Sequence, residues 1–342
     1  MSAGMKKAQD STSNSMILSD TSRTNDKQPC SKATMRHDVG RQTLIVWSFV
    51  ILSGILWMVF QKFRFLFVMF GNVQESEVDG VVIMASGVVA VLVVLVAYRQ
   101  FWIENAKGVR SIHCTIRLSS RQSLDWRIWL YLFVAVLVFA SVGNLFSQGF
   151  QGVLGVLGWP QRNDGAQFGQ MMDGSISALL AVGVAGPVIE GVLLYGIVLP
   201  SLERYGRIFA IITASLLFGC IQGSITQGVS AMLIGLVLGW AASEYSVVWS
   251  MTLCAFYYLV VQEGISSFMT MLSDQTQNVI QYTFDVLLLV VGLVFFVVNR
   301  RKVTDWCASN RSVKHAYQGW RSPLFILTFV IFGFVAVTRL LF

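Results

Sequence analysis

A single acidic residue, Glu190, lies in an apolar stretch that is long enough to cross a membrane. The stretch from Gly186 to Leu202 reads G-P-V-I-E-G-V-L-L-Y-G-I-V-L-P-S-L. A carboxylate at the centre of a membrane helix costs about 2.5 to 3.5 kcal/mol, so such residues usually face the interior of a bundle and mark a functional site. Pro187 interrupts the backbone ladder one turn earlier and is expected to bend or open the helix beside the acid.

Few other polar groups lie at membrane depth. Gln222 can hydrogen-bond Glu190 across a helix interface. Two interpretations of Glu190 stay open: it is the acid of a functional site, or it is a hydrogen-bonded core acid that fixes helix register. Asp285 lies about six residues inside its span and is expected to reach the interface or a polar partner. The histidines all lie in polar segments and no C-x-x-C is present, so the sequence predicts no metal site. The remaining polar residues at depth are Tyr195, Thr213, Ser215, Tyr257, Tyr258 and Gln262.

The elements that must position these groups are membrane helices. Of the 342 residues, 55% are hydrophobic and 13% charged, and the mean hydropathy is +0.64. These values predict an all-α, polytopic transmembrane bundle. Runs of about 20 apolar residues predict nine spans, an eight-span bundle plus a C-terminal helix. We place them at 43–60, 79–98, 128–147, 174–199, 207–223, 226–243, 246–268, 279–299 and 323–342.

The basic residues indicate an orientation. Of the 25 Lys and Arg residues, 21 fall in alternate connections if the N-terminus is cytoplasmic. The positive-inside rule therefore predicts a cytoplasmic N-terminus, and an external C-terminus if the ninth run spans the membrane. The same rule accounts for the net charge of +7 without nucleic acid as a partner.

The chain divides into four predicted regions. Residues 1–42 are a disordered cytoplasmic tail, 43–125 hold two membrane helices and a basic cytoplasmic loop, 126–299 form the membrane core, and 300–342 hold a basic loop and the last helix. The long outer loop 147–173 is either flexible or re-entrant. Two pairs of glycines, Gly219 with Gly223 and Gly235 with Gly239, predict close packing of consecutive helices within the protomer, with a dimer face as the alternative.

Three segments carry a resemblance to a known family. Pro187 to Gly196 reads P-V-I-E-G-V-L-L-Y-G, and Phe218 to Gln222 reads F-G-C-I-Q. An apolar helix with a glycine pair and a short turn then lead into Val247–Val260. From about residue 126 to 299 this order resembles the CPBP intramembrane proteases, which include the type 2 CAAX prenyl protease and bacterial lysostaphin-resistance and bacteriocin-related proteins. Their motifs are E-E-x-x-x-R-G, F-x-x-x-H and H-x-x-x-N.

The resemblance implies a metal-assisted hydrolysis in which the first glutamate activates water and the histidines and asparagine hold metal or the oxyanion. Of the residues to which the family gives a chemical role, only Glu190 is kept here, and Phe218 keeps the aromatic position of the second motif. The other family positions are occupied by Gly191, Tyr195, Gln222, Phe256 and Val260. Glutamine is a poor zinc ligand and phenylalanine is none, so the resemblance predicts neither a three-ligand zinc site nor another cofactor.

The sequence therefore favours a pseudoprotease of the plasma membrane, which binds a membrane or envelope protein or a bacteriocin-like peptide in the former substrate cavity. Its partners would be the lipid bilayer and that protein or peptide. Two alternatives stay open. The first alternative is an active CAAX-type protease that uses Glu190. The second is a proton- or ion-coupled transporter with Glu190 and Asp285 as the coupling acids.

Overall fold

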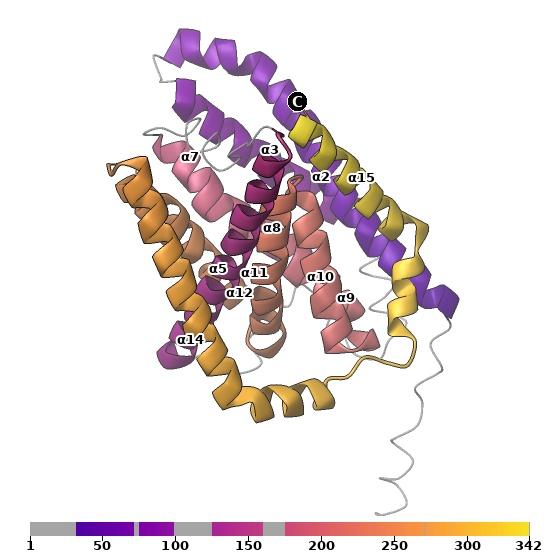
Figure 1. The fold of residues 1–342 in the computed structure, drawn as a ribbon. Coiled ribbons are helices and arrows are strands. Elements are labelled where there is room, and N and C mark those ends of the chain that lie inside the picture. Colours follow the sequence, from indigo (N-terminus) through magenta and orange to yellow (C-terminus); the bar gives the residue numbers. More distant parts are fainter. Residues whose placement is uncertain (1–31, 72–74, 99–124, 160–174, 270, 342) are drawn as a thin grey trace, which may run out of the picture.

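The computed structural model describes residues 32–71, 75–98, 125–159, 175–269 and 271–341 (Figure 1). These residues form a bundle of helices without a strand, which confirms the predicted all-α class. The tail before residue 32, most of the predicted loop 99–127 and most of the second half of the 147–173 loop lie outside the described residues.

Each of the nine predicted apolar runs falls in a helical segment. Among the described residues, six helices are long and apolar enough to cross a membrane, and two shorter apolar helices accompany them. The elements are α2 (Lys32–Gly71), α3 (Glu75–Ala97), α5 (Trp126–Val156), α7 (Ile176–Leu180), η1 (Ala181–Ala185), α8 (Gly186–Glu190), η2 (Gly191–Val198), α9 (Leu199–Leu202), η3 (Glu203–Tyr205), α10 (Arg207–Ile221), α11 (Ile225–Glu244), α12 (Val247–Phe256), η4 (Tyr257–Ile265), α13 (Ser266–Met269), α14 (Asp274–Ser309), η5 (Ala316–Arg321) and α15 (Pro323–Leu341).

The centre of the bundle is built from the segment α7–α9 together with α10, α11 and α12, while α14 lies on one side and α2 with α15 on the other (Figure 1). Glycines let α10 and α11 approach closely, because a Cβ on Gly219 would lie 2.6 Å from the carbonyl oxygen of Gly228. Gly235 and Gly239 also face neighbours within the protomer, as predicted. Gly223 does not belong to such a face, because α10 ends at Ile221 and Gly223 has a φ of 66° in the following turn.

The first helix begins earlier than the sequence pattern predicts. Residues 32–42, which we predicted to belong to a disordered tail, form the first three turns of α2. Met35 and Val39 are buried there, and Asp38 accepts hydrogen bonds from the side chains of Arg204 and Tyr205. Partners that are distant in the sequence therefore stabilise a segment whose own composition is polar.

Two predicted connections are also partly helical. The outer loop was predicted to start at residue 147, but α5 continues to Val156, beyond the length that a membrane crossing needs. The basic connection 300–322 continues α14 as far as Ser309 and then contains η5. Helix α14 turns near its end, and its last part runs beneath the bundle (Figure 1).

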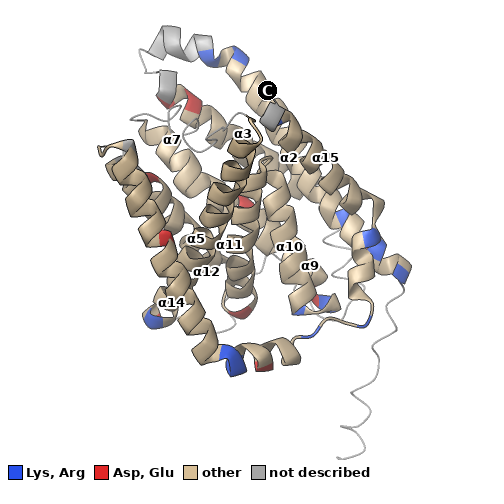
Figure 2. Ribbon diagram, viewed as in Figure 1, with Lys and Arg blue, Asp and Glu red and all other residues tan. Residues whose placement is uncertain are grey.

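Charged residues gather at the two ends of the bundle and are sparse between them (Figure 2). The end from which α2 begins carries most of the Lys and Arg among the described residues, and we call it the basic end (Figure 2). Its network includes an ion pair between Arg207 and Glu244, whose side-chain atoms are 2.7 Å apart. The indole of Trp306 donates a hydrogen bond to the same Glu244 carboxylate over 3.0 Å.

Candidate functional site

The helix that carries Glu190 is anchored at its start by a carboxylate from another helix. Glu77 of α3 accepts hydrogen bonds from the backbone N–H groups of Ile176 and Ser177 over 2.8 and 2.9 Å. The Ser175 hydroxyl accepts a third from the N–H of Ala178. These contacts satisfy donors that the first turn of a helix leaves unpaired, and they fix where the segment α7–α9 begins.

This segment widens on both sides of Glu190. A π-helical stretch, Ala181–Ala185, precedes Pro187, and a second one, Gly191–Val198, follows Glu190. Proline supplies no N–H and its ring crowds the carbonyl one turn earlier, which accounts for a departure from α geometry at this place. In a π-helix the backbone hydrogen bonds join residues i and i+5, so residues five apart lie near the same face. Glu190 and Tyr195 are five residues apart and reach the same cavity, although an α-helix would turn them to different faces.

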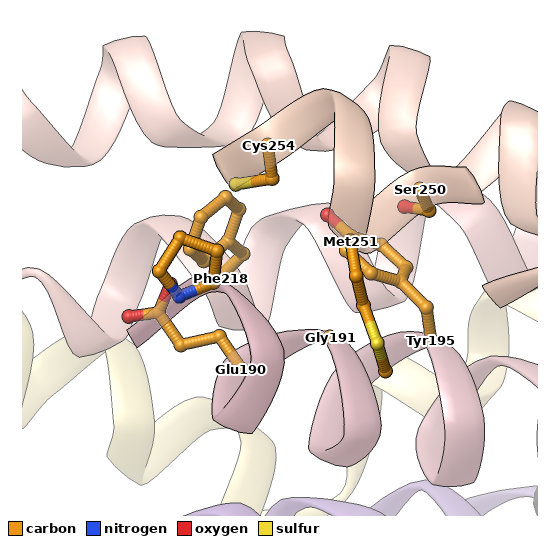
Figure 3. A pocket seen from close by; sticks show the side chains of 8 residues that line it. Glu190, Gly191, Tyr195, Phe218, Ser250, Met251 and Cys254 are labelled. Carbon is orange, nitrogen blue, oxygen red and sulfur yellow. The ribbon is translucent and has the colours of Figure 1, made fainter. Parts of the chain in front are cut away.

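The cavity beside Glu190 is small and mostly apolar (Figure 3). Its walls pack so closely that the space between them holds no water-sized sphere. Tyr195 donates its hydroxyl to the carbonyl of Gly235 over 3.4 Å, and Ser250 donates to the carbonyl of Leu238 over 3.0 Å. Both hydroxyl protons are therefore used within the bundle. The lining residues are Pro187, Glu190, Gly191, Tyr195, Phe218, Ser250, Met251 and Cys254.

Met251 occupies the space that a side chain at position 191 would need. A Cβ on Gly191 would lie 2.5 Å from the Cγ of Met251, and Figure 3 shows the thioether extending from α12 past Gly191 and Tyr195. Atoms cannot pack at that distance, so a glutamate at position 191 would have to displace the Met251 side chain. The methionine fills the volume that the missing side chain leaves.

Four of the predicted positions come together and three do not. Glu190, Gly191, Tyr195 and Phe218 line the cavity, whereas Gln222 caps the end of α10 and is absent from the lining. Glu190 forms no hydrogen bond with Gln222 or with any other described residue, so the predicted pairing of Glu190 with Gln222 is absent.

The third motif lies on the wrong side of its helix for this cavity. Phe256 packs edge-on against Trp129 and Phe133 of α5, with ring centroids 5.1 and 5.0 Å apart. Val260 is 39% exposed. The lining residues of α12 are instead Ser250, Met251 and Cys254, which sequence reasoning missed. Their spacing of three and four residues was the signal that they share a face.

The donor set of the cavity does not fit the zinc ion that the family implies. Glu190 and Cys254 are the lining side chains of a kind that commonly binds zinc, and a catalytic zinc needs three protein ligands. Within the described part of the chain, no group of three or more His, Cys, Asp and Glu residues is placed to hold a metal.

Asp285, the second predicted acid, lies in a separate polar cluster between α14 and α5. Its side chain is buried, and its carboxylate accepts from three carboxamides rather than reaching the interface. Gln281 donates over 3.2 Å, Gln148 over 3.4 Å and Asn144 over 3.5 Å. The cluster ties α14 to the bundle, since most of the other side chains of this helix are exposed.

We expect Asp285→Ala to destabilise the protein by about 2 kcal/mol, because membrane hydrogen bonds average about 0.6 kcal/mol each and three amides lose their acceptor. Asp285→Asn keeps an acceptor oxygen and should lose less than half as much. Thermal unfolding of the purified protein in detergent measures both variants. Equal loss in the two would contradict a role for the acceptor.

Comparison with known proteins agrees with this arrangement. Residues 173–261 match the family model described as type II CAAX prenyl endopeptidase Rce1-like. The match spans the helix of Glu190, α10, α11, α12 and part of η4. No curated protein and no solved structure matches the chain. The resemblance predicted from the motifs is confirmed for residues 173–261, which are similar to the Rce1-like type II CAAX prenyl endopeptidases, and the apolar helices around them indicate an integral membrane protein.

Proposed function

We propose that the protein is a pseudoprotease that binds a membrane segment of a protein or peptide partner and does not cleave it. The observation that carries this proposal is the interlock of Gly191 with Met251 beside Glu190. The second glutamate of the motif is replaced by Gly191, and Met251 fills the space that a side chain at this position would need.

The chemistry of the remaining side chains supports the same conclusion. A general base needs a position within hydrogen-bond reach of the water it activates, and in most sites another group orients it. Glu190 has no such orienting partner among the described residues, and the hydroxyls of Tyr195 and Ser250 donate to backbone carbonyls. An oxyanion at this place would meet Phe218 and Met251, which donate no hydrogen bond.

The outer face of the same helix supports binding of an apolar segment. Ile176, Leu180, Val184 and Val188 follow one another at intervals of four residues and are all exposed in the protein. They form a stripe along the helix that carries Glu190, on which a partner helix can pack in the bilayer. The basic end would face the cytoplasm, in line with the positive-inside rule. Glu190 and Asp285 lie in separate clusters, so the coupled-transporter alternative gains no support.

The test is a cleavage assay in lipid nanodiscs. Purified protein is incubated with a prenylated CAAX peptide and with a single-span peptide, with added zinc or with a chelator, and an active type II CAAX protease serves as the positive control. We expect no product above the rate of Glu190→Gln. Cleavage that the chelator or Glu190→Gln abolishes would refute the pseudoprotease proposal.

Binding is tested separately by a photo-crosslinking residue at Val184 or Val188, introduced in cells that express the full chain. The matched control is the same residue at Val298, which is more exposed but lies on α14. We expect a discrete adduct with another membrane protein or peptide from the stripe and none from the control. Adducts of equal yield at all three positions would show that the stripe is ordinary lipid-facing surface.

A further inference from the structure

Helix α14 is longer than a membrane crossing requires. Its 36 residues correspond to about 54 Å at the rise of an α-helix, against about 30 Å for the hydrocarbon core of a bilayer. The apolar part ends at Val298, and Arg300, Arg301 and Lys302 follow within one turn. These three cations therefore lie where the helix leaves the hydrocarbon.

The neighbouring contacts keep this exit at the edge of the bundle. Beyond it, Trp306 reaches Glu244 and packs against Trp240, with ring centroids 6.3 Å apart, so the end of α14 passes beneath α11. Before it, Phe296 and Val298 are 58% and 75% exposed. The described part of the chain therefore leaves the surface of α14 next to the three cations uncovered.

A fourth cation belongs to the same level of the bundle. Helices α5 and α14 run antiparallel, since Gly292 packs against Val138 and Asp285 meets Asn144. Continuing this register toward the basic end brings Arg127, in the first turn of α5, to the level of the α14 exit. Figure 2 shows basic residues at the corresponding ends of both helices.

The charges of this group are unbalanced. Within the described residues, none of Arg127, Arg300, Arg301 and Lys302 forms an ion pair, in contrast to Arg207 at the same end, which pairs with Glu244. We call these four residues the exit cluster. Asp305 is the one acid among residues 300–309.

We propose that the exit cluster is a binding site for the headgroups of anionic phospholipids in the leaflet at the basic end. The phosphate of a lipid beside α14 lies at the depth at which the apolar run ends, and arginine donates to phosphate through two N–H groups at once. A juxtamembrane cation contributes roughly 1 kcal/mol to binding an anionic membrane surface. The cluster thereby selects negatively charged lipids around α14.

The experiment measures retention of fluorescent phosphatidylglycerol and phosphatidylcholine by the full chain, immobilised in mild detergent. The triple variant Arg300→Gln, Arg301→Gln, Lys302→Gln should bind phosphatidylglycerol at least about tenfold more weakly, with phosphatidylcholine unchanged. The charge-conserving triple variant Arg300→Lys, Arg301→Lys, Lys302→Arg should retain at least a third of the affinity. Glycerol phosphate at millimolar concentration should not displace the lipid. Displacement would be expected only if the cluster were a site for free phosphate.

The matched control removes the same charge at the same end, through Arg311→Gln, Lys314→Gln and Arg321→Gln. These residues are also exposed, but they lie after α14 has passed beneath the bundle. We expect this triple variant to lose less than threefold in affinity. An equal loss in both triples, or no preference for phosphatidylglycerol in the native protein, would overturn the proposal. A loss of folding is recognised by thermal unfolding and by retention of phosphatidylcholine.

Discussion

Gly80→Ala is expected to destabilise the protein by about 3 kcal/mol, at the upper end of the cost of overpacking. A Cβ on Gly80 would overlap the backbone nitrogen of Ala178 and the carbonyl carbon of Ser177. Backbone atoms cannot swing aside as a flexible side chain can, so α3 and α7 must separate. The same movement pulls Glu77 away from the N–H groups of Ile176 and Ser177, so the start of the Glu190 helix loses its cap as well.

Thermal unfolding in detergent measures this effect, and Gly54→Ala is the matched control. Gly54 lies within α2, and a Cβ there would meet no atom within 4 Å. Since alanine is the better helix former, the control should be neutral or stabilising by up to about 1 kcal/mol. If Gly80→Ala unfolded within one degree of the native protein, the close approach of α3 and α7 would be wrong.

Gly191→Glu, which restores the second acid of the family motif, is expected to cost more than 3 kcal/mol. The new side chain would meet Met251 at its first carbon, and its carboxyl would be buried without a partner. Met251→Ala alone should cost about 2 to 4 kcal/mol, because it leaves a cavity. The two changes should compensate each other, since each removes the problem that the other creates.

A double-mutant cycle of these variants gives the coupling energy. We expect Gly191→Glu with Met251→Ala to be at least about 1 kcal/mol more stable than the sum of the single effects predicts. Ser250→Ala replaces Met251→Ala in the control cycle, since Ser250 also lines the cavity but does not fill the space at position 191. Additive behaviour in both cycles would mean that Met251 does not occupy the lost motif position.

The helical segments were predictable because a membrane span is specified by its own apolar composition. The nine runs needed no knowledge of their neighbours. The start of α2 at Lys32 was not predictable in this way, since Met35 and Val39 are buried by partners distant in the sequence, among them Gly319 of η5. The extension of α5 to Val156 is a similar case, because apolar residues separated by glycines are compatible with helix and with loop.

The candidate site was predictable in part because the spacing of the motif residues can be read from the sequence alone. Motif spacing identified Glu190, Gly191, Tyr195 and Phe218, which the structure brings to one cavity. The positions of the third motif do not face this cavity. The rotation of α12 about its axis depends on the turn after α11 and on the side chains against which the helix packs, and the sequence of α12 alone does not specify either. Phe256 finds Trp129 and Phe133, and that aromatic packing directs it away from Glu190.

The π-helical stretch Gly191–Val198 has a consequence for changes in chain length. A wide turn holds one residue more than an α turn, so a deletion within this stretch can be absorbed by narrowing the turn while the flanking helices stay in place. The deletion would separate Glu190 and Tyr195 by four residues of α-helix and keep them neighbours. This part of the span is thus a place where the bundle can lose one residue without a shift of the flanking helices.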